Sequence, residues 1–247
     1  MLYSRVTPHQ KRTQLRAAMA GPAPLVLPGA FNGISAQLIQ RLGYEGVYVS
    51  GHMIAADLGL PDLGLTTATE VAERAGHLAR LVDVPSIVDA DTGFGEPMNT
   101  ARTIQTLEDA GLAGCHLEDQ VNPKRCGHSD GVDVVDTETA VRRVRAAVDA
   151  RRDGAFTIIA RTDARAVLPL ADAIARARAF EDAGADAIFP EALRDESEYA
   201  AFRSAISVPL VINLNEFGRG APSSVDRVAE LGYDVALYPV TLLRLAI

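Results

Sequence analysis

Two aspartates in a glycine-rich turn are the first residues whose types and spacing indicate chemistry. Asp89 and Asp91 lie two residues apart in Asp-Ala-Asp-Thr-Gly-Phe-Gly, and in extended geometry they point the same way. Mg²⁺ takes one or two protein carboxylates, keeps several waters and completes its coordination with substrate oxygens. Glu118, at the end of the next expected strand, is placed to hold such a water. The alternative is an Asp-rich turn that caps the following helix.

A thiol among cations is the second candidate. Cys126 is flanked by Lys124, Arg125 and His128, and nearby positive charge favours the thiolate, which makes this thiol a credible general acid. A loop cysteine is often incidental, and a Cys-x-His zinc site lacks two further ligands here. The long stretch 120–135 is expected to be a loop that closes over a substrate.

An arginine and a Ser-Gly pair are candidates for binding a substrate carboxylate. Arg161 ends the run Ile-Ile-Ala-Arg, and a guanidinium binds a carboxylate with two parallel hydrogen bonds. Its alternative role is a salt bridge to Asp163 or Glu191. Ser50 and Gly51 offer a hydroxyl and a backbone N–H, and the alternative for Ser50 is a helix N-cap.

Tyr48 and Cys115 have competing structural roles. Tyr48 shares a strand face with Ser50 and is a candidate base near the metal, although a core tyrosine is the plainer interpretation. Cys115 is expected to be a buried core residue.

These residues need a scaffold, and the chain alternates short apolar runs with amphipathic helical patterns. Strands are expected at 25–28, 46–50, 86–89, 114–117, 157–160, 187–189, 210–212 and 235–237. Helices are expected at 33–42, 68–81, 98–110, 137–150, 170–183, 196–205 and 223–231. Several helices end in glycine before the next strand (Gly43, Gly111, Gly184, Gly232), as helix C-termini prefer. Eight alternating units predict an α/β fold, a (β/α)₈ barrel forming one catalytic domain over residues 1–247.

In such a barrel the active site lies at the C-terminal ends of the strands. Polar residues follow seven of the eight expected strands: Ser50, Gly51, Asp89, Asp91, Glu118, Asp119, Arg161, Asp163, Glu191, Asn213, Glu216 and Tyr238. Loops are polar in general, but a whole set at one rim favours a site. The eighth helix is expected to be incomplete or missing, because only 239–247 follow the last strand. Either the chain is truncated or a partner subunit supplies the cover.

Composition narrows the function class. The formal charge of −8 gives no electrostatic basis for nucleic-acid binding. No window reaches the roughly twenty apolar residues of a membrane span, and the N-terminus does not resemble a secretory signal. Two cysteines give no disulfide framework, which favours free thiols and a cytoplasmic location.

The motifs resemble those of the isocitrate lyase/phosphoenolpyruvate mutase superfamily, most closely its methylisocitrate lyases. The resemblance covers essentially the whole chain and runs through 27–30, 48–51, 59–62, 89–95, 116–120, 124–128, 159–163, 213–218 and 238–239. The Cys-Gly-His segment is specific to the lyase branch. His52 departs from the pattern, because the lyases usually have a small residue there.

The resemblance implies a ligand set, carried over position by position. Asp89 and Asp91 would bind Mg²⁺, with Asp62 and Glu118 in its outer shell and with Mn²⁺ as a substitute ion. Catalysis would involve Cys126, Tyr48, Arg161 and Glu118. The implied substrate-binding residues are Ser50, Gly51, Gly127, His128, Glu191, Asn213 and Arg244. The resemblance also implies a homotetramer.

The implied reaction is cleavage of a carbon–carbon bond, from 2-methylisocitrate to pyruvate and succinate, within the methylcitrate cycle of propionate catabolism. Isocitrate lyase and 2,3-dimethylmalate lyase activities are the nearest alternatives, because a methyl group in the pocket is worth only about 1–3 kcal/mol. From a different class, the chain would be a catalytically silent barrel that binds tricarboxylates or dicarboxylates.

Overall fold

Eight short parallel strands form the centre of the protein. The computed structural model describes residues 3–125, 131–216 and 224–247. The strands are β1 (Leu25–Pro28), β2 (Val47–Val49), β3 (Ser86–Asp89), β4 (Gly114–Glu118), β5 (Thr157–Thr162), β6 (Ala187–Pro190), β7 (Val211–Asn213) and β8 (Val235–Tyr238). They pair in the orders β2-β3-β4-β5-β6 and β1-β8-β7. Isolated parallel bridges, Gly29 with Tyr48 and Ile188 with Leu210, connect the two sheets into a ring.

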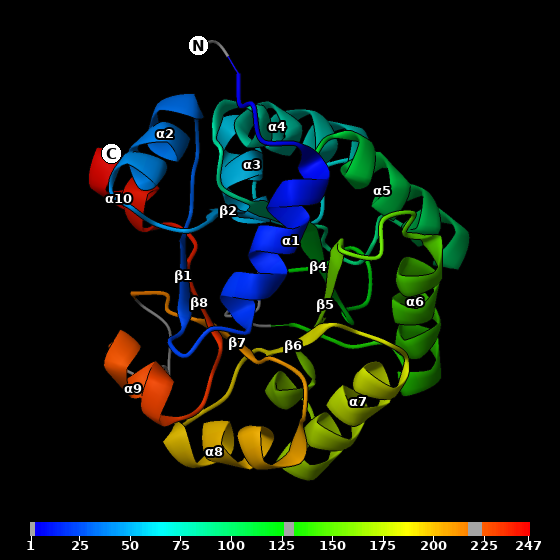
Figure 1. Ribbon diagram of the computed structural model, residues 1–247. Helices are drawn as coiled ribbons and strands as arrows, with labels where there is room; N and C mark the ends of the chain where they lie inside the picture. Colours follow the sequence, from blue (N-terminus) through cyan, green and yellow to red (C-terminus); the bar gives the residue numbers. More distant parts are fainter. Residues whose placement is uncertain (1–2, 126–130, 217–223) are drawn as a thin grey trace.

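Helices surround this ring (Figure 1). They are α2 (Gly33–Arg41), α3 (Gly51–Asp57), α4 (Ala68–Leu81), α5 (Pro97–Asp109), α6 (Thr137–Ala150), α7 (Leu170–Asp182), α8 (Glu196–Ala205), α9 (Val225–Glu230) and α10 (Thr241–Ala246), with a 3₁₀ turn at Ala164–Ala166. Capping boxes begin α2 at Asn32 and α4 at Thr67. The predicted α/β barrel architecture is confirmed, and each predicted strand and helix lies within two residues of its observed bounds.

The core has an inner and an outer layer. Inside the ring, alternate strand residues such as Leu27, Ile87 and Phe189 pack together. The opposite faces of the same strands, including Val88 and Ile188, pack against the surrounding helices. The strands are therefore buried on both faces, as in other parallel sheets.

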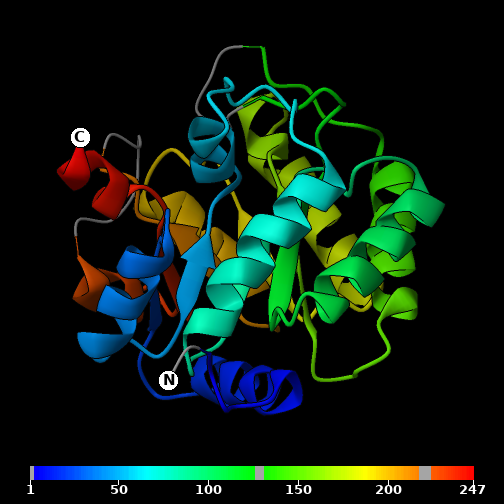
Figure 2. The same ribbon diagram turned by 90° about the horizontal axis from the view of Figure 1, so that it is seen from above.

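An unpredicted helix, α1 (Pro8–Met19), covers the N-terminal ends of the strands, opposite the end where the β–α loops lie (Figure 2). Leu15 and Met19 pack into the inner core. Lys11 Nζ donates to the carbonyls of Ala79 and Val82 at 2.7 and 2.6 Å, so it satisfies acceptors at the end of α4. The helix closes one end of the ring and leaves the other for a site.

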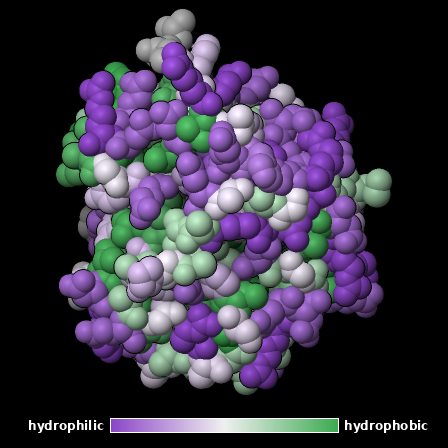
Figure 3. Space-filling model, in the orientation of Figure 1, coloured by the Kyte–Doolittle hydropathy of each residue, from purple (hydrophilic) through white to green (hydrophobic). Residues whose placement is uncertain are grey.

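The surface on the α1 side is mostly hydrophilic (Figure 3). Exposed apolar side chains occur where α2 and α10 lie, at Ile34, Leu38, Leu42 and Leu245. Within the described ranges, no helix combines the length and apolarity needed to cross a bilayer.

Candidate active site

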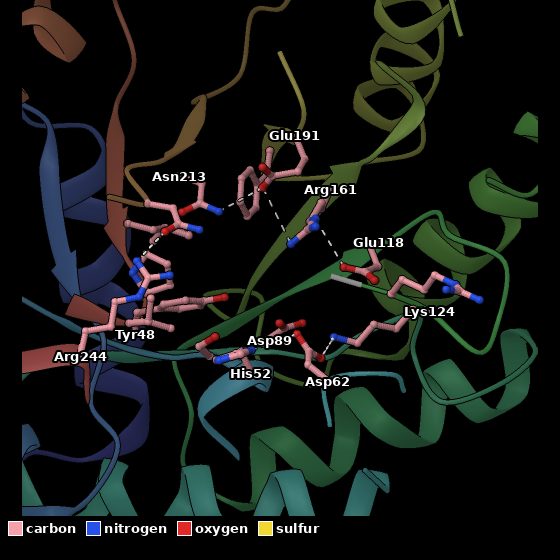
Figure 4. A pocket seen from close by; sticks show the side chains of 17 residues that line it. Tyr48, His52, Asp62, Asp89, Glu118, Lys124, Arg161, Glu191, Asn213 and Arg244 are labelled. Atoms are coloured by element: carbon pink, nitrogen blue, oxygen red, sulfur yellow. Dashed lines mark hydrogen bonds and ion pairs between the residues drawn. The ribbon is translucent and has the colours of Figure 1, made fainter. Parts of the chain in front are cut away.

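A pocket opens at the C-terminal ends of the strands (Figure 4). It gathers nine of the residues predicted from the sequence: Tyr48, Ser50, Asp62, Asp89, Glu118, Arg161, Glu191, Asn213 and Arg244. Residues that were not on that list also line it, among them His52, Lys124, Arg125 and Phe189. Side chains far apart in the sequence therefore face one cavity, while their individual roles stay predictions. Cys126, Gly127 and His128 lie outside the described residues.

Asp89 and Asp91 are held together by a turn and not by extended backbone. Asp91 has a φ of 45°, so the premise that the two point the same way along a strand was wrong. The Asp91 N–H donates to Asp89 Oδ1 at 3.0 Å, and the Gly51 N–H donates to Asp89 Oδ2 at 3.2 Å. Neither aspartate caps α5, whose N-cap is Glu96. Asp89 lines this pocket, whereas Asp91 lines a second pocket together with Thr66, whose Oγ1 donates to Asp91 Oδ2 at 3.3 Å.

Lys124 lies among these acids. Its Nζ is 2.6 Å from Asp62 Oδ1 and 2.9 Å from Asp91 Oδ1, and its side chain is almost fully buried. Burial, then the charge of Asp89, raises the pKa of Asp91 to about 6. Burial opposes ionisation of Asp62 too, but contacts with His52 and Lys124 hold the pKa of Asp62 well below its usual range. Lys124 is therefore the cation that compensates the cluster.

The donor set fits a hard divalent cation. Glu118 Oε1 is buried and has no hydrogen-bond partner among the described residues, and burial raises the pKa of Glu118 well above its usual range. Buried carboxylates that outnumber the nearby cationic side chains are stabilised in their ionised form by an added positive charge. In the part of the chain that the structure describes, no three acidic, histidine or cysteine side chains are placed to ligate one ion together. Mg²⁺ needs only one or two protein carboxylates, because it keeps waters in its coordination shell.

Arg161 is fixed on the opposite wall. Its Nε and Nη2 donate to the two oxygens of Asp163 at 3.0 and 2.8 Å, and its guanidinium carbon lies 5.2 Å from the centre of the Phe189 ring. Glu118 Oε2 is 3.4 Å from Nε, and Glu191 Oε2 is 3.9 Å from Nη1. The salt bridge and the pocket-lining role therefore coexist, because Asp163 orients the guanidinium that lines the cavity.

Tyr48 lies on the inner wall of the pocket, against His116 from β4. Tyr48 Oη is 2.8 Å from His116 Nε2, and both side chains are buried. Burial, then the charge of Asp89, raises the pKa of Tyr48 well above its usual range. Burial also lowers the pKa of His116 to about 4, so the imidazole is neutral near pH 7. Ser50 is at the N-cap position of α3 but makes no side-chain capping bond.

Polar residues from the C-terminal part of the chain lie at the rim of the pocket. Asn213 Nδ2 donates to Glu191 Oε2 at 3.3 Å, and Arg244 Nη1 donates to Asn215 Oδ1 at 2.8 Å. His52, with half of its side chain exposed, has Nδ1 3.5 Å from Asp62 Oδ2. The departure at position 52 thus lies in the wall of the pocket.

Comparison with known proteins identifies relatives over nearly the whole chain. The family model described as phosphoenolpyruvate phosphomutase matches residues 15–247. A probable 2-methylisocitrate lyase 2 of Corynebacterium glutamicum is 56% identical over 98% of this chain and 79% of its own length. The 2-methylisocitrate lyase of Escherichia coli is 43% identical over 96% of this chain and 80% of its own length.

Solved structures of enzymes with the same fold also match nearly the whole chain. A 2,3-dimethylmalate lyase has a TM-score of 0.91 and 36% identity, covering 98% of this chain and 81% of its own. A phosphonopyruvate hydrolase complexed with oxalate and Mg²⁺ has a TM-score of 0.86 and 30% identity, covering 96% of this chain and 82% of its own.

Proposed function

The chain belongs to the phosphoenolpyruvate mutase/isocitrate lyase superfamily, and from this we propose that it cleaves 2-methylisocitrate to pyruvate and succinate. Curated relatives that are 41–57% identical to it carry the name 2-methylisocitrate lyase, in two cases as probable, and such enzymes are carbon–carbon lyases. The observation that carries the proposal is the pocket in which a buried acid cluster faces a fixed arginine. Such a pocket offers a cation site on one wall and a carboxylate-binding group on the other.

Asp89 and Asp91 would hold Mg²⁺, with Asp62 and Glu118 accepting hydrogen bonds from its waters. When bound, the ion would supply positive charge that lowers the pKa of a substrate hydroxyl and stabilises the negative charge on its oxygen. The solved phosphonopyruvate hydrolase with Mg²⁺ and oxalate supports this proposal for the superfamily. Mn²⁺ would be a substitute, since it takes the same hard oxygen ligands.

Arg161 would bind a carboxylate of the succinyl part of the substrate. Asp163 occupies two of its N–H groups, which fixes the plane of the guanidinium before the substrate arrives. When the carbon–carbon bond breaks, its electron pair moves to the succinate carbon and is delocalised into this carboxylate. A preorganised cation stabilises that charge without reorganising. Ser50, Gly51, Asn213 and Arg244 would donate hydrogen bonds to the remaining carboxylates, and Glu191, which accepts a hydrogen bond from Asn213, would contact the substrate beside them.

The reaction requires one proton to be removed from the substrate and one proton to be delivered to the product. Tyr48 Oη would take the proton of the substrate hydroxyl as the ketone of pyruvate forms, and the phenolic proton would pass to His116 Nε2, which lies 2.8 Å away. Cys126 would return a proton to the succinate carbon, so the overall reaction is neutral in protons. Gly127 and His128 would bind the substrate. The roles of these three residues rest on the family resemblance.

A second candidate is cleavage of 2,3-dimethylmalate. The solved 2,3-dimethylmalate lyase supports it, because its fold matches this chain with a TM-score of 0.91. The two substrates differ in one carboxylate, so the cations at the rim, Arg244 and Arg125, would discriminate between them. We also propose a cytoplasmic tetramer: the free, buried thiol of Cys115 fits a reducing compartment, and the family resemblance supports the assembly.

The test is NMR of the products formed from 2-methylisocitrate, isocitrate and 2,3-dimethylmalate in separate tubes, with Mg²⁺ and with EDTA. Pyruvate and succinate from the first, abolished by EDTA, are expected. Glyoxylate formed faster from isocitrate, or propionate from dimethylmalate, would transfer the assignment to the corresponding lyase. Binding of dicarboxylates without turnover of any substrate would establish the silent barrel instead.

The two cysteines provide a matched pair of variants. Cys126→Ser is expected to keep the fold and lose most turnover, because a serine hydroxyl is a far weaker acid than a thiol. Cys115→Ala, in the buried core, is expected to keep turnover. Equal activity in both variants would remove Cys126 from the reaction.

A further inference from the structure

Gln120 holds the backbone of Arg125 with both ends of its side-chain amide. The Arg125 N–H donates to Gln120 Oε1 at 2.9 Å, and Gln120 Nε2 donates to the Arg125 carbonyl at 3.0 Å. These partners fix the orientation of the amide, because the N–H needs an acceptor and the carbonyl needs a donor. We call this pair of hydrogen bonds, which joins residues five positions apart, the Gln120 clamp.

The need to satisfy polar groups does not explain the clamp. Gln120 has 1% of its surface exposed, and burying an amide costs free energy unless its polar atoms find partners. Arg125 is exposed, so water can bind its backbone N–H and carbonyl without any help from Gln120. What the buried amide adds is a fixed place for the Arg125 backbone relative to β4.

Gln120 is itself attached to the wall of the barrel. It forms an antiparallel bridge with Val134, and the next residue, Val121, donates its N–H to the Asp133 carbonyl at 2.9 Å. Arg143 Nη1, from α6, donates to the Gln120 carbonyl at 3.3 Å. The backbone at residue 120 is therefore held from two sides, and the clamp attaches Arg125 to a fixed point.

The residue before Gln120 positions a second arginine of the pocket. Asp119 accepts a hydrogen bond from the Asp163 N–H at 2.9 Å, and the Asp163 carboxylate binds the guanidinium of Arg161. Both Arg161 and Arg125 line the pocket. Two adjacent residues after β4 thus place both arginines, an arrangement suited to binding two carboxylates at a fixed spacing.

We propose that Gln120 is a positioning residue that keeps the Arg125 guanidinium where it binds the additional carboxylate of a tricarboxylate substrate. The inference rests on the proposed lyase function, in which Arg161 binds the succinyl part and Arg125 helps to distinguish 2-methylisocitrate from 2,3-dimethylmalate. Gln120 lies outside the lining of the pocket and acts only through Arg125. It therefore selects the substrate and does not take part in breaking the bond.

Two unreactive acids measure this selection without turnover. Tricarballylate is succinate with one more carboxymethyl arm, and neither compound carries the hydroxyl that the cleavage requires. In titration calorimetry with Mg²⁺, the wild type should bind tricarballylate more tightly than succinate. Gln120→Met should lose about tenfold in affinity for tricarballylate, the scale of one charge-assisted hydrogen bond, and less than twofold for succinate. The retained succinate affinity shows that the variant is folded.

A second variant separates hydrogen bonding from packing. Methionine matches the length of glutamine without its amide, whereas Gln120→Asn keeps the amide but is one methylene too short to reach Arg125. Both variants should lose the same tricarballylate affinity within twofold, while a glutamine that only fills space would tolerate methionine. Gln105→Met is the matched control, because Gln105 Nε2 donates to the Ala150 carbonyl at 3.2 Å in an exposed contact. It should bind both acids as the wild type does.

A double-mutant cycle tests whether Gln120 acts through Arg125. Arg125→Met should lower tricarballylate affinity at least as much as Gln120→Met, and the second change should add no further loss in the Arg125→Met background. Multiplicative losses would overturn the inference, as would equal losses for the two acids or a wild type without preference for tricarballylate.

Steady-state kinetics with 2-methylisocitrate give an independent readout. Gln120→Met should raise KM about tenfold and change kcat less than threefold, because uniform binding energy is lost. A loss confined to kcat would refute the positioning of Arg125 for binding. If the wild type turns over no substrate, the proposed function fails, while the calorimetry still decides the role of Gln120.

Discussion

Replacing Gly51 with alanine tests whether the acid cluster is positioned by its close backbone neighbour. Gly51 begins α3, and its N–H donates to Asp89 Oδ2. A Cβ added there would lie 2.8 Å from Asp89 Oδ2 and 3.3 Å from Asp91 Oδ1. Both contacts are shorter than an ordinary van der Waals contact, so the Asp89 carboxylate must move.

The size of the effect follows from this contact. Restoring 3.4 Å requires the Asp89 oxygen to move by about 0.6 Å. Because a misplacement of about 1 Å can lower a rate roughly a hundredfold, we expect kcat to fall between about 10- and 100-fold, or about 1.4–2.7 kcal/mol of activation free energy. Alanine is the better helix former, so the helix itself is not weakened.

The assay is the initial rate of pyruvate release as a function of Mg²⁺ concentration. Gly51→Ala should need more Mg²⁺ for half-maximal rate and should reach a lower plateau. Gly154→Ala is the control, because a Cβ at Gly154 meets nothing within 4 Å. If Gly51→Ala matches Gly154→Ala in both quantities, the acid cluster does not need the geometry described for it.

Three other variants probe charge. Arg161→Lys should lower kcat/KM by about a hundredfold, since one ammonium cannot bind both oxygens of Asp163 and keep its place in the pocket; a steady-state assay that finds less than a threefold loss would refute this. Burial opposes ionisation of Asp153, but hydrogen bonds from Arg12 and neighbouring groups hold its pKa below the usual range. Its stabilising effect is therefore present above about pH 4 and lost below it, and the gap in Tm between wild type and Asp153→Asn should close as the pH falls through that range; a constant gap would contradict it. Lys124→Met should lower Tm without Mg²⁺ and recover part of the loss with it.

The strands were predictable because each is a short β-rich apolar run, and glycines mark several helix ends. Gly43, Gly111, Gly184 and Gly232 all adopt positive φ values. The helix α1 was missed because the side that it buries includes Lys11 and Arg12 as well as apolar residues, which hides its period. The helix α3 was missed because its seven residues follow β2 directly.

The pocket was largely predictable, because parallel strands bring their C-terminal residues to one end. The contacts that side chains make with one another inside the pocket were not predictable. Lys124 was interpreted only as a neighbour of Cys126, because nothing in the sequence links it to Asp62, which lies 62 residues away. His116 had a usable signal: it shares a strand face with Glu118, so a polar residue inside a fully buried strand pointed into the ring.

Lys124 explains how the acids remain together in the absence of a divalent ion. Its ammonium contacts Asp62 and Asp91, and removing one partner of a buried ion pair destabilises a protein by about 3–5 kcal/mol. In Lys124→Met the acids lose that partner, so a divalent ion gains in affinity while the ion-free fold weakens. An ion that binds only the folded state adds about 2.7 kcal/mol at a hundredfold excess over its Kd. Thermal unfolding with and without Mg²⁺ should therefore show a larger rise in Tm for Lys124→Met than for the wild type. An equal or smaller rise in Tm would mean that Lys124 and the divalent ion do not compensate the same buried negative charge.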